Sequence, residues 1–302
     1  MKNNDLVYNG IIIINKPKGF TRHEVVNKVR GILKMRKVGH TGTLDPEATG
    51  VLPVCVGKAT KVSDMLTATD KEYVANVKLG ICTDTQDIYG TVIEKCDNIN
   101  VTKADILRAL ENFTGEIEQI PPMYSAIKIN GKKMCDLARK GIEVERKPRK
   151  ITIYSAKAEK FYEDGFSMRV HCSKGTYIRT LCDDIGKFLK CYACMSDLQR
   201  TVSGKFNISD AITFDMLENA ANTGNLNSVI LPVDTVFDNY GKYIATDEIV
   251  KRLKNGAPST VKTDTGLYRV YDKNNQFIAV GQVLNINGFN KIKAVKLFSS
   301  NE

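Results

Sequence analysis

The stretch KVGHTGTLDPEATGVLPVCVGKATK, from Lys37 to Lys61, decides the fold of this chain. Its part from Gly39 to Gly50 contains three glycines and one proline, which predicts a loop with special backbone geometry. Such loops carry functional residues more often than they contribute to packing. Within the loop, Asp45 precedes Pro46, and an aspartate before proline is typical of a turn. A structural and a functional role for Asp45 are both open at this point.

The residues before this loop predict a strand followed by a helix. The apolar run Ile11–Ile14 ends in the turn-forming sequence Asn15–Gly19, as expected of a buried strand. Thr21 and Glu24 have the spacing of a helical capping box. The following apolar residues recur at helical spacing and are Val25, Val26, Val29, Ile32 and Leu33.

Strand and helix patterns are interleaved further along the chain. Residues 73–79 and 166–172 alternate between apolar and polar or smaller side chains, which predicts two half-buried strands. Thr102 begins a second capped helix. Its apolar face is expected to contain Ile106, Leu107, Leu110 and Phe113. A third helix is predicted in TYIRTLCDDIGKFL, from Thr176, and the irregular order of elements indicates a mixed α/β sheet fold.

The tail of the chain has a different character. After the polar stretch Leu231–Tyr240, a short helix is predicted over Thr246–Asn255, and strand-like segments follow. From Tyr240 onward there are ten Lys or Arg and five Asp or Glu. We therefore expect a small β-rich accessory domain with a basic face, joined through a boundary that few contacts cross.

The charge of the chain favours an anionic partner. The formal net charge is +10 and the isoelectric point about 9.1. Nucleic acid is the first candidate, and a merely solubilising surface charge is the alternative. The distribution favours nucleic acid, because Lys128–Lys150 contains nine Lys or Arg and three Asp or Glu. This segment is expected to contact phosphates.

Cysteine usage and the apolar runs indicate the compartment. The eight cysteines are scattered, without the dense framework of a small secreted domain, so we expect a reducing cytoplasm. The run Ile11–Ile14 is too short for the core of a signal peptide or for a membrane span. Secretion and membrane insertion are not expected.

Several familiar sites are disfavoured by spacing. Residues 50–58, GVLPVCVGK, lack the spacing and the Ser or Thr after lysine that a phosphate-binding P-loop needs. Cys191 and Cys194 form a single CxxC pair, whereas a structural zinc site needs four well-spaced ligands. The three histidines are dispersed. Neither a metal nor a cofactor is expected.

Four stretches, in order along the chain, resemble the TruB family of tRNA pseudouridine synthases. The first is Lys37–Lys61 together with INKPKGFT before it. The others are KEYVANVKLGICTDTQDIYG from Lys71, IPPMYSAIKINGKK from Ile120 and CSKGTYIRTLCDDIG from Cys172. They cover most of residues 10–205. Four long matches in the right order are far more specific than one short motif.

The resemblance implies that Asp45 is the catalytic carboxylate. Pseudouridine formation breaks the N1–C1′ bond of uridine, rotates the uracil and joins C5 to C1′, so the resemblance implies no cofactor or metal. A carboxylate can attack C1′ or remove the C2′ proton, and both remain open. The resemblance pairs Asp45 with Arg179, whose guanidinium favours an ionised carboxylate. It places Tyr73 against the target base, to help remove the C5 proton, although a core aromatic is the alternative from strand periodicity.

The resemblance also implies RNA-binding residues. His40 would support the rearranged RNA loop, with an ordinary loop histidine as the alternative. Leu198 would form an apolar wall for the uracil, with a core leucine as the alternative. Further RNA contacts are expected from Lys16, Lys128, Lys132 and Lys133. Two departures from the family pattern are Arg22, where serine is common, and Glu47, an added negative charge near Asp45.

The resemblance implies a pseudouridine-synthase fold in two parts. Residues 1–238 would form a catalytic domain on a mixed, largely antiparallel sheet, with a basic RNA-clamping insertion at about 120–150. Residues 239–302 would form a PUA-like RNA-binding domain. The implied reaction isomerises the T-loop uridine of tRNA, position 55, after the base has been flipped out.

Two other functions are open on the sequence alone. The first is a guide-RNA-dependent relative that acts on ribosomal RNA, against which the short tail argues. The second is an RNA-binding or RNA-folding protein that has lost catalysis, against which the combination of Asp45, Tyr73 and Arg179 argues. The expected partner is the T-arm of tRNA, with no obligate protein partner.

Overall fold

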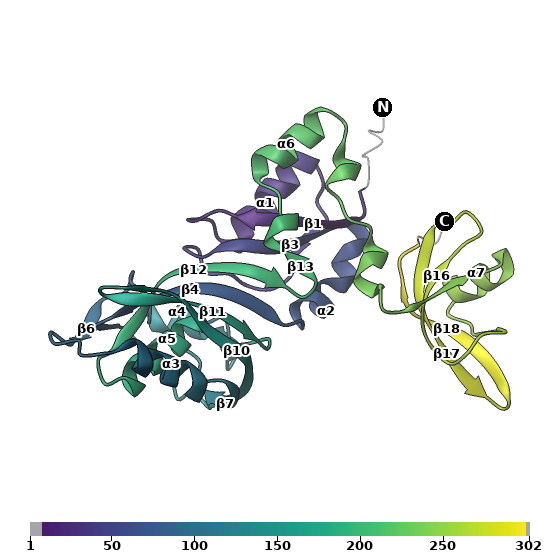
Figure 1. Cartoon of the computed structure of the whole chain (residues 1–302). Helices are drawn as coiled ribbons and strands as arrows, with labels where there is room; N and C mark the ends of the chain where they lie inside the picture. Colours follow the sequence, from purple (N-terminus) through teal and green to yellow (C-terminus); the bar gives the residue numbers. More distant parts are fainter. Residues whose placement is uncertain (1–7, 300–302) are drawn as a thin grey trace.

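The computed structural model describes residues 8–299, which contain one large and one smaller sheet (Figure 1). The large sheet has the strand order β1-β3-β12-β4-β11-β10-β7, with β2 paired to β3 and β13 to β12. Its strands are β1 Gly10–Lys16, β2 Val38–His40, β3 Thr49–Val56, β4 Lys71–Leu79, β7 Gly115–Gln119, β10 Arg149–Tyr162, β11 Gly165–Cys172, β12 Ala193–Ser203 and β13 Phe206–Asn207. Only the pair of β3 and β12 is parallel among these strands, so the predicted mixed, largely antiparallel sheet is confirmed.

Helices cover the large sheet at its two ends. Helices α1 and α6 pack on β1 and β3, whereas α3 and α5 pack on the strands from β12 to β10 (Figure 1). The helices are α1 Arg22–Leu33, α2 Ser63–Thr67, α3 Lys103–Asn112, α4 Met134–Ala138, α5 Ile178–Phe188, α6 Phe214–Asn222 and α7 Asp247–Lys254. Two small hairpins join β5 Ile81–Thr83 to β6 Val92–Lys95, and β8 Lys128–Ile129 to β9 Lys132–Lys133.

The predicted helix starts are confirmed by their caps. The Thr21 hydroxyl accepts from the Glu24 amide and the Glu24 carboxylate accepts from the Thr21 amide, which satisfies free donors at the start of α1. Thr102 caps α3 in the same way. One expectation for α3 is wrong. Leu107 is 53% exposed, and Ala109 lies on the buried face instead, because the helix turns its Ile106 and Leu110 stripe toward the sheet.

Strand β12 joins the two halves of the large sheet. It runs parallel to β3, with Arg200 opposite Gly50, and antiparallel to β4, with Arg200 opposite Tyr73. Gly50 has φ of +102°, and a Cβ atom there would lie 2.2 Å from the main-chain oxygen of Arg200. Only glycine permits this backbone and this approach. The loop that ends at Gly50 is therefore fixed directly beside β12.

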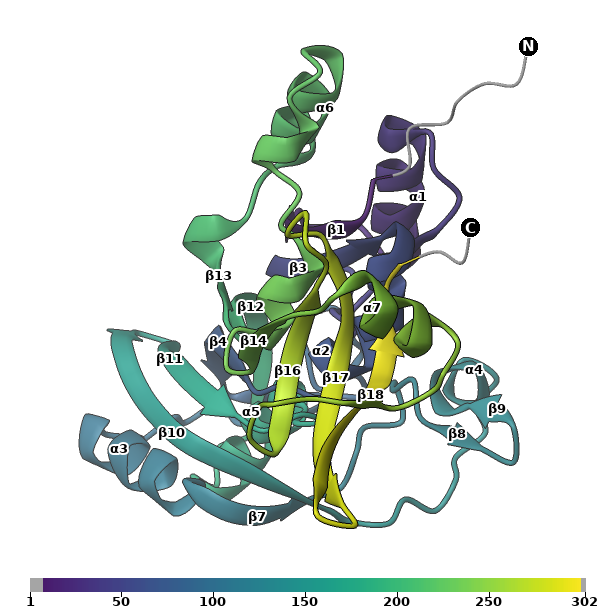
Figure 2. The same cartoon turned by 90° about the vertical axis from the view of Figure 1, so that its right-hand side faces the viewer.

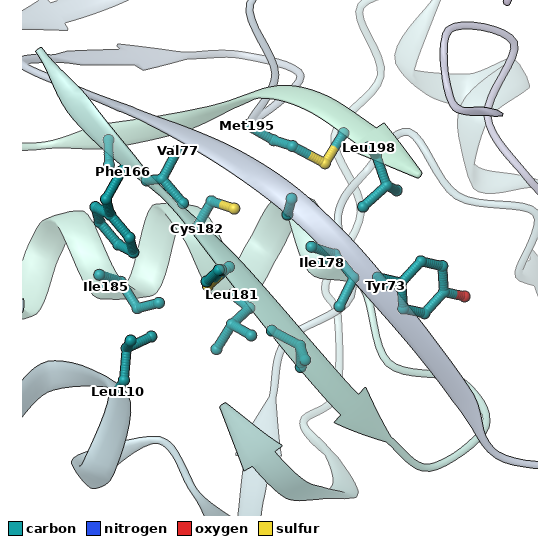
Figure 3. Close-up of a cluster of buried hydrophobic side chains, with 14 of the residues drawn as sticks. Tyr73, Val77, Leu110, Phe166, Ile178, Leu181, Cys182, Ile185, Met195 and Leu198 are labelled. Atoms are coloured by element: carbon teal, nitrogen blue, oxygen red, sulfur yellow. The ribbon is translucent and has the colours of Figure 1, made fainter. Parts of the chain in front are cut away.

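The main apolar core lies between α3, α5 and the central strands (Figure 3). Phe166, Leu181 and Ile185 are completely buried there. Tyr73 lies at one end of this cluster with its hydroxyl group pointing away from it (Figure 3). The core thus fixes the ring of Tyr73 and leaves its polar end at the edge of the apolar layer.

The second sheet has the order β14-β16-β17-β18-β15 and carries α7 beside it (Figure 2). Its strands are β14 Gly241–Ile244, β15 Ser259–Thr260, β16 Gly266–Tyr271, β17 Phe277–Ile286 and β18 Phe289–Leu297. The β-rich tail predicted from the sequence is confirmed.

The expectation that few contacts link the two sheets is wrong. Phe237 is 1% exposed and packs against Phe277 and Phe298, with ring centroids 6.2 and 6.0 Å away. The Lys61 ammonium group donates to the Leu297 carbonyl at 2.7 Å, and Lys296 donates to the Lys61 carbonyl at 2.6 Å. The stretch before the second sheet looks polar in sequence, but its apolar side chains fill one shared cluster.

The basic segment leaves the large sheet and returns to it. Strands β7 and β10 are antiparallel neighbours, and residues 120–148 between them contain the β8–β9 hairpin and α4.

Across residues 8–299, no helix combines the length and the apolar character needed to cross a membrane.

Candidate active site

Asp45 lies in the loop between β2 and β3. The loop is fixed by main-chain bonds, because the Gly19 amide donates to the Pro46 carbonyl at 2.9 Å and the Ala48 amide donates to the Asp45 carbonyl at 3.1 Å. The Asp45 side chain is 37% exposed, so its carboxylate is accessible from a cavity. The loop predicted from its glycines therefore presents a carboxylate on a rigid base.

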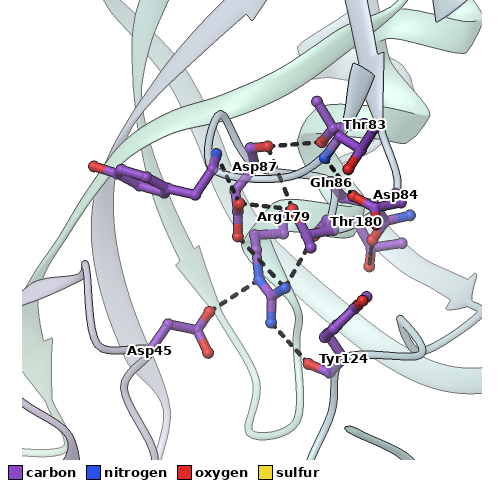
Figure 4. A network of polar contacts seen from close by, with 11 residues as sticks. Asp45, Thr83, Asp84, Gln86, Asp87, Tyr124, Arg179 and Thr180 are labelled. Atoms are coloured by element: carbon purple, nitrogen blue, oxygen red, sulfur yellow. Dashed lines mark hydrogen bonds and ion pairs between the residues drawn. The ribbon is translucent and has the colours of Figure 1, made fainter. Parts of the chain in front are cut away.

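Arg179 binds this carboxylate from the first turn of α5. Its Nε lies 2.9 Å from Oδ2 of Asp45, and its side chain is 7% exposed (Figure 4). Nη1 donates to the Thr85 carbonyl and Nη2 to the Tyr124 carbonyl, each at 2.9 Å. The Asp87 carboxylate lies 3.6 Å from Nη1. The structure thus brings together the predicted pair and fixes the guanidinium from three further sides.

The segment after β5 supports Arg179 and was not assigned a role from the sequence. Gln86 has φ of +63°, and its amide nitrogen donates to Asp183 at 2.9 Å while its amide oxygen accepts from Thr180 at 2.7 Å. These bonds hold the turn that carries Thr85 and Asp87 (Figure 4). The segment lies within one of the four family-like stretches, but nothing in its residue pattern marks Asp87 as a neighbour of Arg179.

Two cavities meet at Asp45. The inner pocket has a volume of about 230 Å³ and is lined by Asp45, Tyr73, Arg179 and Leu198, among others. The outer cleft has a volume of about 490 Å³ and shares Asp45, Arg179 and Leu198 with the inner pocket. Four cationic side chains, Arg22, Lys133, Arg139 and Arg179, line the outer cleft together with four carboxylates, Asp45, Glu47, Asp87 and Asp197. A chain that lies in the cleft would bring one of its groups to the inner pocket beside Asp45.

Tyr73 and Leu198 both line the inner pocket. Both side chains are largely buried, at 8% and 6% exposure. Burial raises the pKa of the Tyr73 phenol, and the nearby Arg200 guanidinium partly opposes that rise. Tyr73 is therefore both part of the core and part of the pocket wall, so the two interpretations of its sequence position are not exclusive.

Lys16 does not take the place expected of an RNA contact. Its side chain is completely buried, and its ammonium group donates to the carbonyls of Pro17, Phe20 and Pro46 at 2.7–2.9 Å. Burial lowers the pKa of Lys16 to about 8, and Glu47 and Asp45 partly oppose that shift. All three ammonium donors are used by main-chain oxygens, so Lys16 holds the Asp45 loop and does not face an RNA phosphate.

The remaining predicted RNA contacts lie around the outer cleft or on the basic hairpin. Lys133 lines the cleft, whereas Lys128 and Lys132 are exposed on the same β8–β9 hairpin. His40 ends β2 and is half-buried, with its ring 6.2 Å from that of His23. Burial lowers the pKa of His40, and the nearby Arg22 adds to this effect.

No group of side chains in residues 8–299 has the arrangement of a metal site. Groups of three or more His, Cys, Asp or Glu that could hold an ion are absent there. The described cysteines are all free, and Cys191 and Cys194 are both buried.

Comparison with known proteins identifies the family. Residues 30–178 match the model of the N-terminal domain of TruB family pseudouridylate synthase. Residues 179–238 match the model of the tRNA pseudouridylate synthase B C-terminal domain.

Sequence relatives extend over nearly the whole chain. A tRNA pseudouridine synthase B from Clostridium kluyveri is 46% identical over 297 residues, which cover 96% of this chain and 99% of that protein. A tRNA pseudouridine synthase B from Bacillus subtilis is 46% identical over 255 residues, or 82% of each chain.

A chain of a solved Cbf5–Nop10–Gar1 complex has the same architecture. It is 28% identical, with a TM-score of 0.70, over 96% of this chain and 85% of that chain. The paired Asp45 and Arg179, the mixed sheet that positions them and the sequence relatives agree, and the chain belongs to the TruB family of pseudouridylate synthases.

Proposed function

We propose that this chain converts the T-loop uridine at position 55 of tRNA to pseudouridine, with Asp45 as the catalytic carboxylate. The observation that carries the proposal is the position of the Asp45–Arg179 pair, because both residues line the inner pocket as well as the outer cleft. A uridine stacked inside a folded T-loop cannot reach such a pocket, so it must be flipped out, at a cost of a few kcal/mol of stacking. The name tRNA pseudouridine synthase B of the relatives supports tRNA as the substrate.

The pocket residues divide the proposed reaction between them. Asp45 attacks C1′ or removes the C2′ proton, and either route breaks the N1–C1′ bond. Arg179 keeps the carboxylate in one orientation, because its other donors are bound to the main chain. Leu198 and the ring of Tyr73 confine the freed uracil while it rotates. After C5 has joined C1′, Tyr73 takes the C5 proton.

RNA affinity in this proposal comes from basic side chains outside the pocket. The β8–β9 hairpin, with Lys128, Lys132 and Lys133, lies in the insertion at about 120–150 and would close on the T-arm. Residues 239–302 would form a PUA-like domain that binds a second part of the RNA. Phosphate contacts of this kind supply affinity and position, while the pocket supplies chemistry.

The proposal includes a stand-alone enzyme in the cytoplasm. Relatives named tRNA pseudouridine synthase B match this chain over 82–96% of its length, which favours a tRNA enzyme over a guide-RNA-dependent one. The presence of Asp45, Tyr73 and Arg179 around one pocket disfavours a purely RNA-binding protein. The eight free cysteines support a reducing compartment.

The test is conversion of an unmodified tRNA transcript. Purified protein should form pseudouridine at position 55, and a transcript with cytidine at that position should gain none elsewhere in the T-loop. Formation of pseudouridine only at other positions would refute the T-loop assignment. Absence of any product with a folded, tRNA-binding protein would refute the enzymatic proposal.

A further inference from the structure

Arg200 on β12 is a buried cation without a carboxylate partner in the described part of the chain. Its side chain is 1% exposed. Nε donates to the Val51 carbonyl at 2.7 Å and Nη1 to the Thr43 carbonyl at 3.5 Å, whereas Nη2 is buried without a hydrogen-bond partner among residues 8–299. A guanidinium that is buried without a counter-charge, and with one N–H group unpaired, is costly to folding. A negative charge that forms nearby during function would compensate this cost.

The group beside Arg200 that can acquire such a charge is the phenol of Tyr73. The two residues are Cα partners on the antiparallel strands β12 and β4, and residues paired in this way project on the same face of a sheet. Burial raises the pKa of Tyr73, and Arg200 is the strongest opposing influence. The guanidinium and the phenol therefore interact within one buried layer.

Other groups around the phenol do not replace Arg200. Asp45, from the neighbouring loop, disfavours a phenolate because it is negatively charged. Cys172 also adjoins the phenol, but burial raises the pKa of its thiol to about 12, so it is neutral at ordinary pH. Arg200 is thus the cation that partly opposes the effects of burial and of Asp45 on the pKa of Tyr73.

The C5 proton transfer of the proposed function requires a negative charge on the Tyr73 oxygen before the proton is taken. When C5 has joined C1′, it carries both the ribose and its original proton. The Tyr73 phenolate takes this proton, the C–H electron pair forms the C5=C6 double bond, and N1 gains a proton from water. The resulting phenol releases its proton to water, so the isomerisation has no net gain or loss of atoms. A neutral phenol cannot accept the C5 proton, which makes the phenolate essential.

We propose that Arg200 is a positioning residue that stabilises the Tyr73 phenolate as the base for the C5 proton. This inference rests on the proposed function of the site. Its rival is a purely structural role, because Thr43 lies in the Asp45 loop, Val51 lies in the strand that follows it, and Arg200 binds the carbonyls of both. The two roles make different demands on the side chain, since the loop needs a donor and the phenolate needs a positive charge.

Two variants separate these roles. Arg200→Gln keeps an amide donor for the loop and loses the charge, while Arg200→Lys keeps the charge. Single-turnover rates are measured on tRNA transcripts with hydrogen or deuterium at C5 of uridine. Thermal unfolding and tRNA binding identify variants that fold. The same rates are measured with 3-fluorotyrosine, a more acidic phenol, at position 73.

We expect Arg200→Gln to slow conversion on the order of 10²-fold, the usual scale for general-base catalysis. Its C5 deuterium isotope effect should exceed that of the unaltered enzyme, because proton removal becomes rate-limiting. Arg200→Lys should lose less rate. Fluorotyrosine at position 73 should restore part of the rate lost in Arg200→Gln and should not accelerate the unaltered enzyme to the same extent.

An unchanged rate in Arg200→Gln would overturn the inference. So would a slow variant whose isotope effect is unchanged and which fluorotyrosine does not rescue, since that result assigns Arg200 to holding the loop. If Arg200→Gln does not fold, the isotope effect and fluorotyrosine rescue of Arg200→Met, which also loses the charge, decide in the same way. Lack of pseudouridine with the unaltered enzyme would instead contradict the proposed function itself.

Discussion

Nε of Arg179 lies 2.9 Å from Oδ2 of Asp45, while Nη1 and Nη2 of the same guanidinium each donate to a main-chain carbonyl at the same distance. The two carbonyls belong to Thr85 and Tyr124, in segments on either side of α3 in the sequence. These main-chain bonds fix the guanidinium of Arg179 independently of its contact with Asp45. The guanidinium and the Asp45 loop together hold the carboxylate, which limits the directions in which it can approach a ribose.

Replacing Asp45 by Asn should abolish pseudouridine formation and leave tRNA binding nearly intact. The amide can neither attack C1′ nor accept a proton, whereas affinity comes mainly from phosphate contacts. Single-turnover conversion and filter binding measure the two effects. Glu47→Gln, which removes a carboxylate from the same loop and cleft, is the matched control and should stay active. More than trace turnover by purified Asp45→Asn would contradict the assignment.

Replacing Asp87 by Asn should lower kcat on the order of 10- to 100-fold with little change in KM for tRNA. The Asp87 carboxylate lies 3.6 Å from Nη1 of Arg179, so its loss weakens the hold on the guanidinium, and small misplacements in active sites have effects of this size. Asp97→Asn, at an exposed position, is the control. A normal kcat for Asp87→Asn would show that the two carbonyls suffice to orient Arg179.

Replacing Lys128, Lys132 and Lys133 together by Ala should weaken tRNA binding and flatten its salt dependence. A plot of log affinity against log salt concentration has a negative slope. For every phosphate that is no longer neutralised, the magnitude of this slope should decrease by about 0.9. Conversion at saturating tRNA should change little, because the inner pocket is intact. Affinity measured at several salt concentrations tests this, with exposed Lys160→Ala on β10 as the control. An unchanged slope would place the RNA away from this hairpin.

Phe298→Ala should lower the free energy of unfolding of the whole chain by about 3–5 kcal/mol, the usual cost of removing a buried phenyl ring. Phe298 is 4% exposed and packs on Phe237 and Phe277, so the loss affects both sheets. Phe289→Ala, at a residue that is 62% exposed, should change stability by less than about 0.5 kcal/mol. If the chain unfolded in two separate transitions and Phe298→Ala shifted only one of them, the expected coupling between the two sheets would be contradicted.

The lowered pKa of buried Lys16 predicts that the stability of the unaltered protein, relative to Lys16→Met, depends on pH. Its pKa falls from 10.5 to about 8 on folding, so between these values the unfolded chain binds more protons than the folded one. Stability then rises with pH across this window. The free energy of unfolding, measured with urea, should therefore rise from about pH 8 to about pH 10 in the unaltered protein relative to Lys16→Met. Below about pH 8 the difference in the free energy of unfolding between the two proteins should be constant. If this difference were also constant from about pH 8 to about pH 10, the pKa of Lys16 would not be lowered in the folded protein.

The sequence was sufficient for most elements and for the central pair of the site. Glycine and proline predicted the Asp45 loop, capping boxes predicted α1 and α3, and alternation predicted β4 and β11. These signals are local and do not depend on the rest of the fold. Arg179 followed only from family resemblance, because its partner is brought near by the sheet.

The errors share one physical cause. Lys16 looks like a surface lysine in INKPKG, yet three carbonyls converge on its ammonium group only in the folded chain. The stretch before β14 looks polar, but Phe237 packs against Phe277 and Phe298 at the boundary between the two sheets. Asp87 and Arg200 are likewise defined by tertiary neighbours. The order of residues along the chain does not indicate which of them will be in contact in the folded protein.

The double pairing of β12 constrains which length changes the chain can accept. Along this strand, Leu198 and Arg200 share one face, and their register is set by β3 on one side and β4 on the other. From Leu198 to Arg200 the pairing with β4 has no bulge, so inserting or deleting one residue between them would turn one of the two side chains to the opposite face, because strand side chains alternate. A substitution at Leu198 or Arg200 therefore leaves the other side chain in place, whereas a single codon inserted or deleted between them separates the pocket wall from the buried cation.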